Sequence, residues 1–124
     1  MPALYSDLLL DHFRNPRNFG SLSAPDITCE AFNPLCGDRV RIELQLKGDT
    51  VCAVRFQGDG CAICLAAASM LTELIAGLEI NNGEIISSEQ LLASLKSEIQ
   101  ATRVKCALLP LEALRSGVKQ YKER

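Results

Sequence analysis

The sequence has little net charge, no basic leader and no long apolar run. Its 13 basic and 15 acidic side chains leave a formal charge of -2 at pH 7. This charge argues against binding of nucleic acid through a broad basic surface. The N-terminal stretch "MPALYSDLLLDHF" contains acids and lacks the basic start of a secretory signal. The longest apolar runs are shorter than a membrane span. These absences favour a cytoplasmic protein that binds neither nucleic acid nor a membrane.

The chain also lacks internal repeats, low-complexity tracts and linkers, so we expect its 124 residues to form one domain, 1–124. Hydrophobic residues make up 48% and charged residues 23% of the sequence, which argues against disorder. A domain of this length buries about two-thirds of the surface that its unfolded chain exposes. It therefore needs no disulfide bond to fold.

Histidine is scarce and cysteine is abundant. The one histidine, His12, is expected at the surface or at a helix end, as most such residues are. In a reducing compartment, cysteines are expected to be metal ligands, reactive thiols or core residues rather than disulfides. There are six: Cys29, Cys36, Cys52, Cys61, Cys64 and Cys106.

Hydrophobic periodicity predicts a helix and then three strands in the first half of the chain. Residues 3–13 carry apolar side chains at helical spacing, and Pro16 and Gly20 end this helix. The predicted strands cover residues 27–33, 39–47 and 51–57. Because the second strand alternates between apolar and polar residues, we expect an antiparallel sheet with one face exposed to water.

Helices are predicted for the second half. The stretch "CAICLAAASMLTELIAGL" is apolar nearly all round, as in a helix packed centrally against the sheet. Another helix is expected to open at Ser87 or Ser88, and the last to run through "PLEALRSGVKQYKE" with Pro110 in its first turn. Strands followed by helices predict an α+β domain, in which a small three-stranded antiparallel sheet carries helices on one face.

Three cysteines fall at the ends of predicted elements. Cys36 precedes the second strand, Cys61 follows the third strand and opens a helix, and Cys106 lies just before the last helix. In an antiparallel hairpin the start of one strand lies beside the end of the next, so "LCGD" and "GDGC" are expected at the same edge. The thiol of Cys36 and the carboxylate of Asp38 are both groups that can hold a metal.

Local charge is expected to favour reactive thiolates at these positions. Cys61 lies at a helix N-terminus, where the positive partial charge favours an anion. Arg103 and Lys105 flank Cys106 and are expected to favour its thiolate as well. The glycines of "LCGD" and "GDGC" would let the backbone approach a bound group closely.

Each feature has a simpler interpretation when taken alone. Cys29 and Cys52 lie at apolar positions of their strands and are expected in the core. Asp38 could be an ordinary turn residue. "CAIC" lacks the βαβ surroundings of a redox dithiol, and Cys64, one turn after Cys61, is expected to pack in the core rather than to serve as a spare thiol. The three cysteines at element ends together favour a site.

The stretches "DHFRNPRNFG", "NPLCGD", "GDGCAIC" and "RVKCALLPLEAL" resemble the U-type iron–sulfur scaffold family, which comprises IscU, SufU and the N-terminal domain of NifU. The similarity covers nearly the whole chain. It implies a compact α+β fold and a metal or cluster site formed by Cys36, Asp38, Cys61 and Cys106. It also implies a pyridoxal-phosphate-dependent cysteine desulfurase as sulfur donor and iron–sulfur proteins as cluster acceptors.

The chain combines features of two branches of this family. Lys105 stands where IscU-type members have a histidine, and "RVKC" looks more like SufU. The segment "SEIQATRVKC" lacks the proline-containing chaperone-docking stretch of IscU-type members. The interval between Cys61 and Cys106 is nevertheless too short for the insertion that SufU-type members usually carry.

Three thiolates and one carboxylate suit iron or zinc. Iron holds the harder Asp38 carboxylate less tightly than a fourth thiolate, which suits a scaffold that builds a transient 2Fe–2S cluster and then releases it. Cys106 is the predicted persulfide acceptor, with Cys36 as the alternative. The principal rival is a zinc-dependent sulfurtransferase that acts with the desulfurase. A structural zinc site in an interaction module is a third interpretation.

Overall fold

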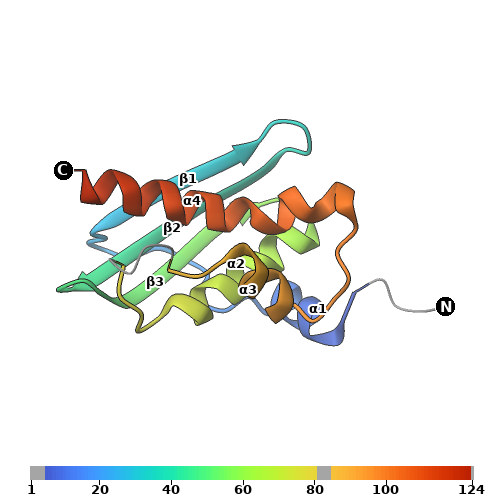
Figure 1. Cartoon of the computed structure of the whole chain (residues 1–124), viewed down its shortest axis with the longest axis horizontal. Coiled ribbons are helices and arrows are strands. Elements are labelled where there is room, and N and C mark those ends of the chain that lie inside the picture. Colours follow the sequence, from blue (N-terminus) through green and yellow to red (C-terminus); the bar gives the residue numbers. More distant parts are fainter. Residues whose placement is uncertain (1–4, 81–84, 124) are drawn as a thin grey trace.

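A three-stranded antiparallel sheet carries helices on one face (Figure 1), which confirms the predicted α+β class. The computed structural model describes residues 5–80 and 85–123. Within these ranges, no helix has the length and apolar character needed to cross a bilayer. The strand order is β1-β2-β3. The elements are α1 (Asp7–Arg14), β1 (Ile27–Asn33), β2 (Asp38–Lys47), β3 (Thr50–Asp59), α2 (Ala62–Ile75), α3 (Ser88–Ser94), the 3-10 turn η1 (Ala101–Arg103) and α4 (Val104–Lys122).

The central strand β2 supplies part of the core. Val40, Ile42 and Leu44 are fully buried, as the alternation of the sequence predicts. Glu43 is only 4% exposed although it lies at a polar position. Its carboxylate accepts hydrogen bonds from the Arg41 guanidinium, so its burial leaves the charge partnered.

Strand β3 departs from the predicted alternation at a β-bulge. Gln45 pairs with Ala53, but the next residue, Leu46, pairs with Val51, which leaves Cys52 as an extra residue. The extra residue reverses the alternation, so Val51 is buried and Cys52 is exposed. The prediction that Cys52 lies in the core is therefore wrong.

Helix α2 lies at the centre of the helical layer (Figure 1). Cys61 is its N-cap residue, as the sequence predicts, and the helix continues to Ile75. It packs against α1, α4 and the sheet, and most of its residues are buried. This burial on several sides explains why its sequence is apolar nearly all round.

Helix α3 opens as predicted and ends early. The hydroxyl of its N-cap residue, Ser87, accepts the Gln90 N–H, and the Gln90 side chain accepts the Ser87 N–H. This reciprocal pair is a capping box. Lys96 has a positive φ of 50°, which ends the helical conformation before the predicted stretch is complete.

The last helix begins earlier than predicted. It starts at Val104, directly after η1, so Cys106 lies in its first turn and not ahead of it. Pro110 lies further inside the helix, where it cannot donate the hydrogen bond that the Cys106 carbonyl would accept. Because Pro110 is buried against the rest of the protein, packing offsets this lost bond.

Helix α4 crosses β1 at Gly117, where there is no room for a side chain. A Cβ at this position would lie 2.6 Å from both Cβ and Sγ of Cys29. Cys29 is 7% exposed, which confirms that it belongs to the core. The glycine therefore weakens the helix locally but allows its close approach to the sheet.

We expect Gly117→Ala to lower the free energy of unfolding by about 1–3 kcal/mol, the usual cost of overpacking, although alanine favours the helix by roughly 1 kcal/mol. Urea unfolding measures the difference. Ser116→Ala is the matched control, because Ser116 is exposed on the same helix and should lose no stability. A Gly117→Ala chain as stable as the parent would contradict the close approach.

Helix α1 begins at Asp7, later than predicted. The hydroxyl of Ser6 accepts the Leu9 N–H and caps the helix. Tyr5 and Ser6 therefore precede the helix, and residues 3 and 4 of the predicted helix lie outside the described residues.

His12 lies in the last turn of α1, so the alternative of a helix end is confirmed. It is buried against α2 with 2% of its surface exposed, so the alternative of a surface position is wrong. Its Nδ1 lies 2.7 Å from the Ser69 hydroxyl, whose oxygen also accepts the Arg17 N–H at 2.8 Å. Its Nε2 lies 3.4 Å from the Glu73 carboxylate. These partners on α2 are distant in the chain, which is why no local sequence signal announces them.

Burial lowers the pKa of His12, and the charge of Arg17 acts in the same direction, against Glu73 and Asp11. The unfolded chain therefore binds a proton more readily than the folded chain. We expect the free energy of unfolding to fall as the pH drops below 6.5, the ordinary value for histidine. In His12→Asn, which cannot titrate, the decline should be shallower. Urea titrations across this pH range compare the two chains, and parallel curves would contradict a neutral buried ring.

Candidate metal centre

Three segments of the chain meet at one end of the sheet. Cys36 lies in the turn between β1 and β2, and Asp38 is the first residue of β2. Cys61 is the N-cap of α2, and Cys106 lies in the first turn of α4. The antiparallel register places the start of β2 beside the end of β3, so "LCGD" and "GDGC" share an edge as predicted. Helix α4 brings Cys106 to the same place, where its sulfur lies beside that of Cys36.

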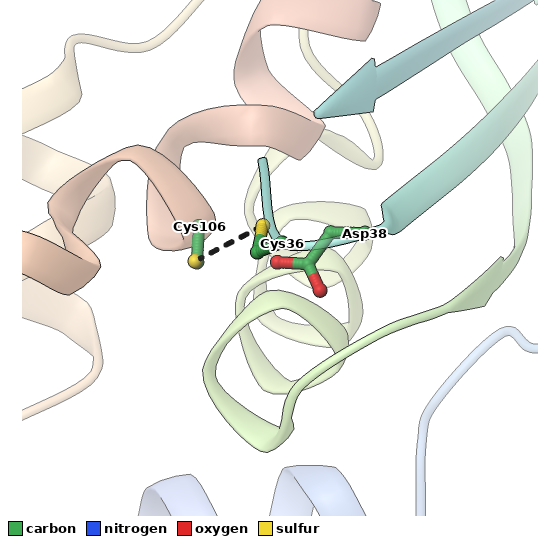
Figure 2. Close-up of side chains that lie close together, drawn as sticks. All are labelled: Cys36, Asp38 and Cys106. Carbon is green, nitrogen blue, oxygen red and sulfur yellow. Dashed lines mark hydrogen bonds between the residues drawn. The ribbon is translucent and has the colours of Figure 1, made fainter. Parts of the chain in front are cut away.

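The side chains of Cys36, Asp38 and Cys106 converge between the first turn of α4 and the start of β2 (Figure 2). The two sulfur atoms are 3.8 Å apart, and one ligand atom from each of the three residues lies within 4.8 Å of the others. Cys61 lies outside this group of three but contacts it, because its thiol donates to Oδ2 of Asp38 at 3.5 Å. Cys61, the fourth predicted ligand, therefore contacts the group through a hydrogen bond to the Asp38 carboxylate.

A glycine allows Asp38 to reach the beginning of α2. A Cβ at Gly60 would lie 2.5 Å from Oδ1 of Asp38, and this oxygen accepts the Cys61 N–H at 3.0 Å. The first N–H groups of a helix lack partners within the helix, so the carboxylate satisfies one of them and complements the helix dipole. Sequence reasoning missed this second role of Asp38, because the two residues are 23 positions apart.

The surroundings of Asp38 favour its ionised form although only 1% of its surface is exposed. Burial acts to raise its pKa, but the Cys61 N–H and the thiols of Cys36, Cys106 and Cys61 outweigh burial and hold that pKa below its usual value. The centre therefore presents a negative charge surrounded by thiols.

The thiol of Cys106, in contrast, is held in its neutral form. Burial raises its pKa to about 12, and Asp38, Cys36 and Cys61 act in the same direction. Arg103 favours the Cys106 thiolate, as predicted, but burial and the Asp38 carboxylate outweigh it, so the expected net preference of Cys106 for the thiolate is wrong. A coordinating cation would reverse this balance, since it deprotonates its thiol ligands.

The donor set fits iron or zinc. Thiolates suit borderline and soft cations, and a carboxylate can complete a set of four ligands around either metal. Asp38 and Cys106 are buried, whereas Cys36 is exposed and Cys61 is partly exposed. The centre is thus open to a partner on one side and held by rigid elements on the other.

Cys64 does not join this group. It is fully buried in the hydrophobic core, and burial raises its pKa above the usual range of a thiol. It packs as the favoured interpretation predicts.

Comparison with known proteins gives consistent matches over the whole chain. Residues 4–124 match the family described as NifU-like N terminal domain. The chain is 34% identical to the zinc-dependent sulfurtransferase SufU of Bacillus subtilis (strain 168), over 95% of this chain and 91% of that protein. It is 31% identical to the iron–sulfur cluster assembly scaffold protein IscU of Azotobacter vinelandii, over 97% and 95% respectively.

Solved structures show the same fold. The crystal structure of FiSufU from Fervidobacterium islandicum AW-1 superposes with a TM-score of 0.77 at 25% identity, covering 93% of this chain and 96% of that one. A NifU-like protein (N-terminal) from Brucella abortus gives a TM-score of 0.79 at 18% identity, covering 98% and 96%. The arrangement of sheet and helices is therefore shared.

Proposed function

We propose, because this chain belongs to the family of NifU-like N-terminal domains, that it is an iron–sulfur cluster assembly scaffold formed by one domain, residues 1–124. Its cargo is a transient 2Fe–2S cluster. A pyridoxal-phosphate-dependent cysteine desulfurase supplies the sulfur, and iron–sulfur proteins accept the finished cluster. The setting is a reducing compartment such as the cytoplasm, where the thiols stay reduced.

The observation that carries this proposal is the convergence of thiols and a single carboxylate at one partly exposed end of the sheet. In the proposal, Cys36, Asp38, Cys61 and Cys106 hold the cluster. An electron carrier would be better served by four thiolates, since the potential of a cluster depends on firm and invariant ligation. One carboxylate among three thiolates suits a cargo that must leave.

Sulfur acceptance is assigned to the pair Cys106 and Cys36. Cys106 is our first choice, because the charge of Arg103 favours its thiolate and would stabilise the anion during attack on a donor persulfide. Cys36 is the second choice, because it is exposed whereas Cys106 is 3% exposed.

A zinc-dependent sulfurtransferase is the second candidate. It is favoured by the 34% identity to a protein of that name over nearly the whole chain and by the basic residues Arg103 and Lys105 beside Cys106. In this alternative, zinc binds the same four residues until one thiol leaves the metal to take sulfur.

Anaerobic reconstitution separates the two candidates. The chain is incubated with ferrous iron, sulfide and a reductant, and its visible absorbance is followed before and after addition of an iron–sulfur acceptor protein. A scaffold gains cluster absorbance and passes it to the acceptor. Tight zinc binding with faster desulfurase turnover, and no cluster absorbance, would contradict the scaffold and support the sulfurtransferase.

A further inference from the structure

The closest pair of thiols in the centre joins an exposed turn to a buried helical turn. Cys36 and Cys106 have their sulfur atoms 3.8 Å apart, whereas a disulfide requires about 2 Å. Cys106 is fixed in the buried first turn of α4. Cys36 lies in an exposed turn, and the following Gly37 has a φ of +76° with no heavy atom near its missing Cβ. A small shift of this open turn would close the gap.

Sulfur that arrives from a desulfurase is at the wrong oxidation level for a cluster. A persulfide carries sulfane sulfur, whereas cluster assembly consumes sulfide, so two electrons must be supplied. We propose that Cys36 and Cys106 supply them as a resolving pair, in which one thiol attacks a persulfide on the other and releases sulfide. This inference rests on the proposed function, because it assumes that the centre receives sulfur.

The step balances without another reactant. The attacking thiolate forms a bond to the inner sulfur of the persulfide, and the sulfur–sulfur bond to the outer atom breaks. The outer sulfur departs with the electron pair of that bond and, with the proton of the attacking thiol, leaves as hydrogen sulfide. The two cysteine sulfurs are thereby oxidised to the Cys36–Cys106 disulfide.

The other thiols are less well placed for this step. Cys61 is engaged by Asp38 through both its N–H and its thiol. Cys29 and Cys64 are enclosed in the core. Cys52 lies on the exposed side of the sheet, where its thiol donates to the Gln45 carbonyl. The pair Cys36 and Cys106 is therefore the one that can close within the centre.

The product also defines a further reaction class. The disulfide removes two of the proposed cluster ligands, so a dithiol reductant must reopen it before the next cluster can be held. The sulfurs of Cys36 and Cys106 would thus release sulfide in one step and bind a cluster in another, after reduction.

The test uses a Cys52→Ser parent, because this exposed thiol would otherwise take up sulfur away from the centre. Metal-free chain is loaded with sodium disulfide as the persulfide probe, desalted and incubated without oxygen or reductant. We expect sulfide release in step with loss of the added sulfur, a product two hydrogen atoms lighter than the reduced chain, and a cross-linked peptide pair containing Cys36 and Cys106. Adding Cys36→Ser or Cys106→Ser should abolish both sulfide release and the cross-link, leaving the extra sulfur in place.

Several outcomes would overturn the pair: a persulfide that persists in the parent, a cross-link to another cysteine, or undiminished sulfide release in Cys36→Ser. Circular dichroism of each variant establishes that the fold is retained. A parallel incubation with a cysteine desulfurase and L-cysteine separates this inference from the proposed function. Failure of the desulfurase to load the chain counts against sulfur acceptance, whereas an enzyme-loaded persulfide that persists counts against the resolving pair alone.

Discussion

Serine in place of Cys106 is expected to weaken the binding of zinc or ferrous iron by at least about 100-fold. Substitutions that only reorient a ligand already cost 10–100-fold, and loss of a direct thiolate ligand should cost more, because an alcohol stays protonated and is a harder donor than sulfur. Cys106 is also the buried thiol of the group, so a solvent molecule does not easily take its place as a ligand. Competition with a chromogenic chelator measures the dissociation constant.

Two further substitutions compare how much the sulfurs of Cys36 and Cys61 contribute to metal affinity. Cys36→Ser should also weaken metal binding, because the Cys36 sulfur belongs to the same group as the Cys106 sulfur. Cys61→Ser is the sharper test, because this sulfur reaches the group through Asp38 and must move closer to bind a shared ion. Retention of full affinity in Cys61→Ser would reduce the ligand set to three residues.

Cys52→Ser is the matched control for these variants. Its thiol is exposed and donates to the Gln45 carbonyl within the sheet, so the substitution should change stability by less than about 0.5 kcal/mol and leave metal affinity intact. An equal loss of affinity in Cys52→Ser would contradict the assignment of the centre.

The meeting of distant segments was predictable because it follows from topology. Alternating apolar residues fixed the strands of the hairpin, and antiparallel pairing then required "LCGD" and "GDGC" to share an edge. Cys61 at a helix start followed from the change from strand to helical periodicity. None of these inferences needed knowledge of side-chain contacts.

Features that depend on contacts between distant residues were not predictable. The bulge at Cys52 arises from how β3 pairs with β2, and the burial of His12 depends on Ser69 and Glu73 of another helix. The basic neighbours of Cys106 are visible in the sequence, whereas the burial and the Asp38 carboxylate that outweigh them are not. Propensity and local charge describe neighbours along the chain, but these outcomes were decided by neighbours in space.

The early start of α4 also results from contacts between residues that are distant in the chain. Proline is a strong local signal for a first turn, and it suggested that the helix begins near Pro110. Packing of the buried Pro110 within a longer helix overrides this preference. As a result Cys106 is carried by a helical turn, which fixes its direction toward Cys36 more firmly than a loop would.

Replacing Asp38 by alanine is expected to lengthen the lifetime of a bound cluster by about tenfold or more and to slow its transfer. When the cluster leaves, the Asp38 carboxylate can return to the Cys61 N–H, which it accepts at 3.0 Å, and to the surrounding thiols. Hydrogen bonds to charged groups contribute about 1.5–3 kcal/mol each, and about 1.4 kcal/mol corresponds to a tenfold change. Asp38 therefore stabilises the state that follows release, and alanine removes that stabilisation.

Asparagine at the same position separates the two properties of the carboxylate. Asp38→Asn keeps an oxygen that can accept the Cys61 N–H but loses the charge, so its cluster lifetime should lie between those of the parent and Asp38→Ala. Decay of visible absorbance in the presence of an acceptor protein gives the transfer rate of each chain. Equal rates in all three would show that the carboxylate does not govern release. A faster loss in Asp38→Ala would show instead that Asp38 holds the cluster as firmly as a thiolate, which would remove the physical reason for assigning release to this residue.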